Sequence, residues 1–204
     1  MSSATPAAAP ATDRWERMDP HKMAMLAFIA SETVFFTMLI LTYIFYREAP
    51  ATAGGPTAAT ALDVPLTGLF TVALLASSGT IWMADRSLTA GKEGAMRLWL
   101  LATIVLGAVF LGGQANEYIR LLTKDVTVTR NLFGTTFYTL TGFHAFHVFG
   151  GLIALLILFI VAMTGQFKGT RHSSALETIS LYWHFVDVVW IFVFSVVYLW
   201  ALAG

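Results

Sequence analysis

The sequence predicts an all-α membrane protein built as a bundle of five transmembrane helices. Of its 204 residues, 57% are apolar or aromatic and only 12% are charged, whereas a soluble domain carries about 25% charged residues. Five apolar stretches approach or exceed the roughly 20 residues that a helix needs to cross a bilayer core about 30 Å thick. The formal net charge is zero, so the composition excludes an ordinary water-soluble enzyme and a nucleic-acid binder that relies on net charge.

Each apolar stretch is expected to be helical, because lipid offers no hydrogen-bond partner to an unpaired backbone group. A closed β-barrel would instead show short segments of alternating polarity. The first stretch is interrupted only by Glu32 and small hydroxyl residues, and the others are similarly continuous. The predicted spans are residues 23–46, 65–84, 98–118, 137–163 and 179–202.

The segments between the spans predict the orientation. Residues 1–20, rich in Ala, Pro and Ser, are expected to form a flexible tail, and residues 21–204 a single transmembrane domain. Cytoplasmic loops carry an excess of Lys and Arg, and the side with the tail holds eight such residues against four on the other side. We therefore expect a cytoplasmic N-terminus and a C-terminus outside, in the periplasm. The eight are Arg14, Arg17, Lys22, Arg86, Lys92, Arg97, Lys168 and Arg171, and the four are Arg47, Arg120, Lys124 and Arg130.

Six ionisable residues lie inside the predicted spans and are the candidate functional residues. A charge in mid-bilayer costs at least about 2.5–3.5 kcal/mol, so such groups normally face protein and have partners. His144 and His147 are three residues apart, as are His184 and Asp187, so each pair shares one helical face. Three of the six lie near the middle of their spans, at depths where they could meet. The six are Glu32, Glu117, His144, His147, His184 and Asp187.

Three interpretations compete for these residues. They could converge on a metal or haem, because histidine is the commonest metal ligand. They could form a proton path, which needs carboxylates and histidines at staged depths. They could be structural, joining helix to helix or to a lipid headgroup through hydrogen bonds, and the residues alone favour this one. The chain has no cysteine, which excludes thiolate-bound zinc, copper and iron–sulfur centres and covalent c-type haem.

Glycine pairs and aromatic residues are expected to serve packing. Gly112-Gly113 and Gly150-Gly151 lie in mid-span, where small residues allow close approach of helices. Aromatic rings near the ends of the spans are expected at the membrane boundary, where amphipathic rings are favoured. Those rings are Trp99, Trp183, Tyr198 and Trp200.

Four segments resemble the haem–copper oxidase subunit III family in order and spacing. Residues 182–190, YWHFVDVVW, are similar to the family's last-helix signature, and residues 141–147, TGFHAFH, to the helix before it. Residues 28–36, FIASETVFF, resemble the segment that carries the family's intramembrane carboxylate, here Glu32. Residues 113–118, GQANEY, resemble a fourth segment, with Asn116 where the family commonly has an aromatic residue. The chain has five predicted spans and looks like the short bacterial form, whereas mitochondrial-type members have seven.

The resemblance implies an accessory subunit of a proton-pumping cytochrome c oxidase of aa3 or caa3 type in the bacterial plasma membrane. It implies no haem or copper in this chain, because the family's partner subunits carry these. It also implies direct packing against subunit I, with subunit II and a small subunit IV as further partners and with bound phospholipid. For Glu32, Glu117, His144, His147, His184 and Asp187, it implies structural, lipid-related or proton-related roles, with Glu32 the strongest candidate for function.

Two other functions remain open at this point. The same motifs occur in quinol oxidases and in a protein that accompanies nitric oxide reductase, and the electron donor is chosen by a different subunit. A stand-alone membrane metal or haem protein would use the His144, His147, His184 and Asp187 positions. A transporter is disfavoured by the odd number of spans and the absence of an internal repeat.

Overall fold

The fold is a bundle of five long helices. The computed structural model describes residues 19–47, 62–124, 126–129 and 132–200. Each helix is long and apolar enough to cross a membrane, which confirms the number of predicted spans. The helices also extend beyond the predicted spans into polar flanking residues. They are α2 (Pro20–Arg47), α4 (Val64–Thr89), α5 (Glu93–Thr123), α6 (Leu132–Met163) and α7 (Ser174–Phe194), which continues into the π-helical turn η1 (Ser195–Leu199).

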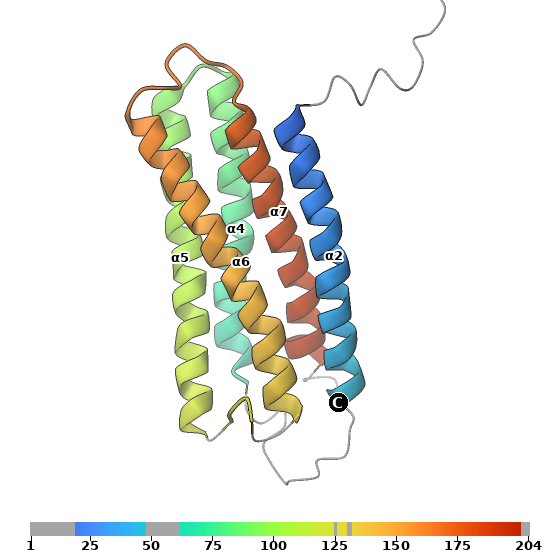
Figure 1. The fold of residues 1–204 in the computed structure, drawn as a ribbon. Helices are drawn as coiled ribbons and strands as arrows, with labels where there is room; N and C mark the ends of the chain where they lie inside the picture. Colours follow the sequence, from blue (N-terminus) through green and yellow to red (C-terminus); the bar gives the residue numbers. More distant parts are fainter. Residues whose placement is uncertain (1–18, 48–61, 125, 130–131, 201–204) are drawn as a thin grey trace, which may run out of the picture.

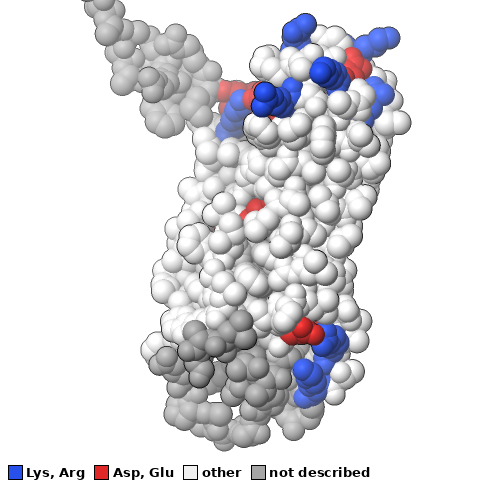
Figure 2. Space-filling model, turned by 180° about the vertical axis from the view of Figure 1, so that it is seen from behind, with Lys and Arg blue, Asp and Glu red and all other residues white. Residues whose placement is uncertain are grey.

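Successive helices run in opposite directions along one common axis (Figure 1). We call the end that holds Asp19 and the 90–92 and 164–173 connections the near end. The opposite end, which holds Asp63 and residues 124–129, is the far end. Figure 2 shows charged side chains gathered at these two ends and a broad, nearly uncharged belt between them. The predicted tail lies almost entirely outside the described residues.

Short polar residues fix where the helices begin. Asp63 caps α4 by accepting a hydrogen bond from the backbone N–H of Leu66, and Pro65 follows at the first turn. Ser173 caps α7 by accepting from the N–H of Leu176. Each cap satisfies an N–H group that has no partner within its helix. The tight connection from α4 to α5 turns at Gly91, whose φ of 72° is a conformation that glycine adopts without strain.

Two tryptophans of α7 form the centre of the bundle. Trp183 and Trp190 are both fully buried, and each ring nitrogen donates a hydrogen bond to a hydroxyl of α4. Trp183 donates to Ser77 over 2.8 Å, and Trp190 donates to Thr71 over 3.0 Å.

Trp183 was expected at the membrane boundary, and that prediction is wrong, because its ring packs against Gly107 and Gly151 in the middle of α5 and α6. Tyr198, also expected at the boundary, lies in the last described turn, where it is fully buried and its hydroxyl donates to Glu117.

Only one glycine of each predicted pair allows a close approach. A Cβ on Gly151 would lie 2.8 Å from two ring carbons of Trp183, and a Cβ on Gly113 would lie 2.3 Å from Phe70 Cδ2. Gly112 has nothing within 4 Å, and Gly150 has only the Tyr182 hydroxyl at 3.9 Å. The other glycine of each pair is exposed on the outer face.

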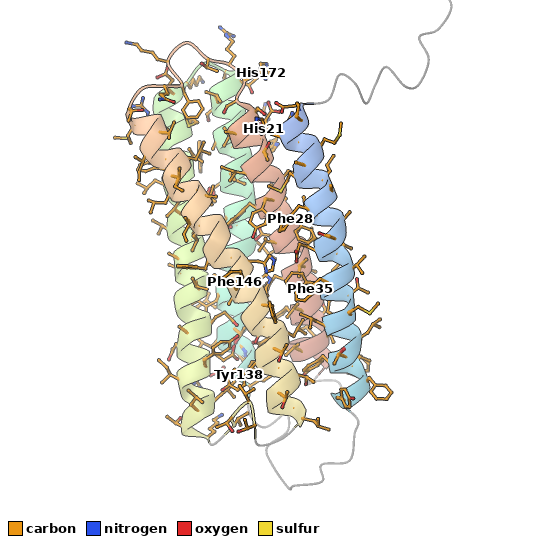
Figure 3. All side chains as sticks on the ribbon, viewed as in Figure 1. His21, Phe28, Phe35, Tyr138, Phe146 and His172 are labelled. Atoms are coloured by element: carbon orange, nitrogen blue, oxygen red, sulfur yellow. The ribbon has the colours of Figure 1, made fainter. Side chains whose placement is uncertain are left out.

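Helix α2 lies at the edge of the bundle. Only 6% of the residues in its most apolar 18-residue segment are buried, compared with 28% to 39% in the corresponding segments of the other four helices. Phe28 contacts Tyr182 with ring centroids 6.2 Å apart, and Phe35 contacts Phe143 at 5.0 Å (Figure 3). The rest of the α2 surface is largely apolar and uncovered by the described part of this chain.

These contacts predict opposite outcomes for two adjacent substitutions. Gly151→Ala is expected to lower the free energy of unfolding by about 1–3 kcal/mol, because the new methyl group would overlap the Trp183 ring. Gly150→Ala is expected to be neutral or to stabilise by up to about 1 kcal/mol, because alanine favours the helix. Thermal unfolding of the two variants in the same detergent measures the difference. Equal midpoints for both variants would contradict the packing described for Gly151.

Candidate functional site: intramembrane polar clusters

The six predicted ionisable residues do not form one site. Glu32 pairs with His147, His184 and Asp187 share a serine, and Glu117 has its own set of donors near the far end. His144 is buried and makes no hydrogen bond to any of these three groups. Of the two pairs expected to share a helical face, His184 and Asp187 have a common hydrogen-bond partner, Ser78, whereas His144 and His147 have no common hydrogen-bond partner among the described residues. The expectation that Asp187 could meet Glu32 and His147 is not met, because its hydrogen bond goes to α4 instead.

Glu32 of α2 and His147 of α6 form a contact in mid-membrane. Glu32 Oε2 lies 3.2 Å from His147 Nε2, and the side chains are 19% and 11% exposed, respectively. The other ring nitrogen, Nδ1, lies 2.7 Å from the backbone carbonyl oxygen of Phe143. The Phe36 ring covers the imidazole with its centroid 5.0 Å away. The pair therefore joins the peripheral helix to the bundle within a mostly apolar surrounding.

The hydrogen bond to Phe143 determines how many protons the pair holds. A carbonyl oxygen can only accept, so Nδ1 of His147 donates and carries a proton. Nε2 and the Glu32 carboxylate would both be acceptors if no further proton were present. Their contact thus needs one more proton, located either on Nε2, which gives an ion pair, or on the carboxyl, which gives a neutral pair. The geometry accommodates both forms without moving a side chain.

A row of four hydroxyl residues on α4, which we call the hydroxyl row, bonds to side chains of α5 and α7. Thr67 donates to Glu117 over 3.1 Å, and Thr71 and Ser77 accept from the two buried tryptophans. Ser78 lies 2.9 Å from His184 Nδ1 and donates to Asp187 Oδ2. Interhelical hydrogen bonds in membranes average about 0.6 kcal/mol, with a maximum of about 1.7 kcal/mol. The row comprises Thr67, Thr71, Ser77 and Ser78.

The sequence interpretation missed these partners, although a signal was available. Thr67, Thr71 and Ser78 are spaced by four and seven residues, the separation that places residues on one helical face. The signal is weak by itself, because threonine and serine in a span also bond to their own helix, as Thr37 does to the Thr33 carbonyl. Thr71 and Ser77 make such a bond and also accept from the tryptophans opposite them.

Glu117 of α5 is buried near the far end of the bundle. Its Oε1 accepts from the Thr67 hydroxyl, and its Oε2 accepts from the Tyr198 hydroxyl at 2.7 Å and from Gln114 Nε2 at 3.3 Å. These donors come from α4, η1 and α5 itself. The carboxyl thus joins α4, α5 and η1 through hydrogen bonds.

His144 is surrounded by aromatic rings. It is 1% exposed, stacks on Trp190 with centroids 4.8 Å apart, and meets Phe110 and Phe36 edge-on. Among the described residues, neither of its nitrogens has a hydrogen-bond partner. Its surroundings are those of a packed ring rather than of a metal ligand. Across the described ranges, no three His, Asp or Glu side chains converge in a way that could hold a metal ion.

Ionic contacts also link the helices at both ends. At the near end, Lys22 pairs with Glu177, and Asp19 accepts from the Ser174 hydroxyl, so α2 is joined to the start of α7. The neighbouring His21 and His172 lie at the same end (Figure 3). At the far end, Arg120 Nη2 lies 2.7 Å from Asp63 Oδ2. The Arg120 hydrogen bond and then the Leu66 N–H lower the pKa of Asp63 below its usual range.

Comparison with known proteins gives consistent matches over most of the chain. The family model described as cytochrome c oxidase subunit III matches residues 14–202. The probable cytochrome c oxidase subunit 3 of Nocardia farcinica is 36% identical over 173 residues, which cover 85% of this chain and 84% of the relative. The cytochrome c oxidase subunit 3 of Synechocystis is 35% identical, covering 89% and 76%. The cytochrome bo(3) ubiquinol oxidase subunit 3 of Pseudomonas aeruginosa is 35% identical, covering 84% and 81%.

The Asp63–Arg120 pair predicts a local dependence on pH. Because the folded pKa of Asp63 is lowered, its ionised form stabilises the start of α4 above the usual aspartate pKa. That stability is lost as the pH falls through the lowered folded value, so the protection of the Val64, Leu66 and Thr67 amides against exchange, relative to their intrinsic rates, should fall there. Asp63→Asn keeps the cap and removes the ion pair, at a cost of about 0.2–1 kcal/mol for such an exposed pair. Hydrogen exchange in Asp63→Asn that kept the wild-type pH dependence would contradict the assignment.

Proposed function

The chain belongs to the cytochrome c oxidase subunit III family, and from that premise we propose that it is the accessory subunit III of a proton-pumping cytochrome c oxidase of aa3 or caa3 type. The family is a component of haem–copper oxidase complexes, and this chain is a multi-pass membrane protein. In the proposal, residues 21–204 form the unit that assembles. The subunit carries no redox centre of its own and supports the partner subunit that reduces oxygen.

The observation that carries the proposal is how the intramembrane carboxylates and imidazoles are used. Glu32, His147, His184 and Asp187 have hydrogen-bond or ionic partners within the chain rather than a common point of convergence. This arrangement suits a subunit that stabilises a neighbouring subunit and supports its proton uptake. It also weighs against a stand-alone metal or haem protein, since such a site would need several of these groups around one ion.

The exposed side of α2 is proposed to face phospholipid and subunit I, with subunit II and a small subunit IV completing the complex. Four large apolar side chains on this helix are between 53% and 75% exposed. In a membrane, such a surface is covered by acyl chains or by another transmembrane helix. The four are Val34, Met38, Leu41 and Phe45.

The Glu32–His147 pair is proposed to support proton uptake by the complex. Besides the proton on His147 Nδ1, the pair holds one further proton, either on His147 Nε2 or on the Glu32 carboxyl. No other charged group of the described chain pairs with it at this depth. A group of this kind passes a proton on without leaving a bare charge in the bilayer. Glu117, His184 and Asp187 are proposed to act as polar links between helices, and His144 as a packed core ring.

The near end is proposed to face the cytoplasm of a bacterial cell and the far end the periplasm. The described basic residues are more numerous at the near end, as Figure 2 shows, and positive loops are retained inside. They are Lys22, Arg86, Lys92, Arg97, Lys168 and Arg171, against Arg47, Arg120 and Lys124 at the far end.

A second candidate function is subunit III of a haem–copper quinol oxidase. The specific observation in its favour is the ubiquinol oxidase relative from Pseudomonas aeruginosa, whose identity of 35% is close to the 36% of the Nocardia farcinica relative. The motifs of this chain do not select the electron donor.

Purification through a tag on this chain, in mild detergent, tests complex membership. We expect haem bands in the reduced-minus-oxidised spectrum to travel with larger co-purifying subunits and to be absent from the separated chain. The haem type and a copper-binding partner then distinguish the cytochrome c oxidase from the quinol oxidase. Haem or metal retained by the separated chain would contradict the proposal.

Glu32→Ala tests the functional pair. The complex is expected to assemble, but its activity should decay faster during sustained turnover, by about fivefold or more in half-life. That ratio corresponds to roughly 1 kcal/mol, the cost of leaving a buried partner such as His147 unsatisfied. Thr33→Val is the matched control, because within the described ranges the Thr33 hydroxyl bonds only to the Ile29 carbonyl of its own helix. Turnover that persists unchanged over many cycles in Glu32→Ala would contradict the proposed role.

A further inference from the structure

A small cavity lies beside Glu117 at the far end, between α4 and α5. Its volume is about 10 Å³, the space occupied by one water molecule. Leu66, Phe70 and Leu121 form apolar walls, and Thr67 and Glu117 contribute the polar atoms. Asp63 and Arg120, which form the ion pair described above, also line it.

Gly113 keeps this space open. Gly113 also lines the cavity, and a Cβ at this position would come within 2.3 Å of the Phe70 ring. Any larger residue would push that ring out of its place in the wall. The cavity therefore depends on the close approach of α4 and α5 at Gly113 and Phe70.

The ion pair places the cavity next to the aqueous phase. The side chains of Asp63 and Arg120 are 36% and 42% exposed, respectively, whereas Glu117 is only 7% exposed. Asp63 is held in place from two sides, by Arg120 and by the backbone N–H of Leu66 that it caps. A single water in the cavity would thus stand between a buried carboxyl and exposed, hydrated charges.

The hydrogen bonds of Glu117 suit both protonation states. Gln114 Nε2 can only donate, so it fixes one interaction with Oε2. The Thr67 hydroxyl donates to Oε1 when the carboxyl is ionised and can accept when Oε1 is protonated. A proton can therefore arrive at Oε1, on the side of Thr67, without any side chain leaving its position.

The polar groups that line the cavity are those a water there would meet. Thr67 and Glu117 face it from the buried side, and Asp63 and Arg120 from the exposed side. A buried water needs two to four polar partners, and these groups supply them. Gln114 donates to Glu117 from outside the cavity and is not one of its lining residues.

We propose that Glu117 is a proton-binding site that exchanges its proton with the far-end aqueous phase through one water in the cavity beneath the Asp63–Arg120 pair. This site is separate from the Glu32–His147 pair, and the inference needs only the membrane-spanning bundle, not the oxidase assignment. The proton moves between the Glu117 carboxyl and the bound water, and the water passes it to the hydrated surface, so no other reactant is required.

Charged and titratable groups surround Glu117 on every packed element. Asp63 comes from the start of α4, Arg120 from the next turn of α5, and Tyr198 from η1. Tyr118 follows Glu117 in α5, and Tyr138 of α6 lies close enough to interact with it electrostatically.

Infrared difference spectroscopy on the full-length chain, purified with its natural companions into lipid nanodiscs, tests the site. The wild type minus Glu117→Gln spectrum is expected to contain a protonated-carboxyl band that grows as the pH is lowered. The band should shift promptly when the sample is moved into D2O. Thr67→Val should retain the band but slow its shift by about tenfold, the factor that corresponds to roughly one lost hydrogen bond.

Thr37→Val is the matched control, because in the part of the chain that the structure describes the Thr37 hydroxyl bonds only to the Thr33 carbonyl of α2. Its exchange rate should equal that of the wild type. The proposal is overturned if the pH-dependent band is missing from the wild type, or if the band persists unshifted in D2O. It is equally overturned if Thr67→Val exchanges as fast as Thr37→Val. If Glu117→Gln fails to fold, the band of Glu117 is still identified as the protonated-carboxyl band whose D2O shift is slowed in Thr67→Val. The wild-type pH and D2O measurements then decide the matter.

Discussion

The bundle depends on one interaction, namely the hydrogen bonds that most polar side chains inside the membrane find in protein. His144 is an exception among the described residues, because it packs among aromatic rings without such a bond. The hydroxyl row of α4 supplies these bonds for both buried tryptophans, for Glu117 and for the His184–Asp187 pair. Each bond contributes little by itself, but together they set how α4, α5 and α7 are turned about their axes. The close contacts at Gly151 and Gly113 exist because that rotation is fixed.

Helix α2 is attached to the bundle by far fewer contacts. It is held by ionic contacts at the near end, by aromatic rings along its length and by Glu32 in mid-membrane. Because its polar contact to His147 requires one shared proton, the attachment of α2 and the protonation of the pair are physically linked. A peripheral helix with a proton-dependent contact is a reasonable element for a subunit whose family works beside a proton-pumping centre.

Much of the architecture could be predicted from the sequence, and the rest depends on helix rotation. Apolar stretches are long enough to reveal the five spans, and the cost of a buried charge correctly predicts partners for Glu32 and Glu117 but not for His144, which has none among the described residues. Spacing also places His184 and Asp187 on one face. Nothing in a single sequence says which direction that face points. Trp183 was therefore misplaced at the membrane boundary, and Gly150 could not be told from Gly151.

The most direct test of the account is a double-mutant cycle on Glu32 and His147, with the half-life of oxidase activity during turnover as the measured quantity. If the two side chains act as one unit that holds one proton, Glu32→Gln, His147→Gln and the double variant should decay at similar rates. The coupling free energy would then be of the order of 0.5–3 kcal/mol. If the effects of the two substitutions multiply, the residues act independently and the central claim is wrong.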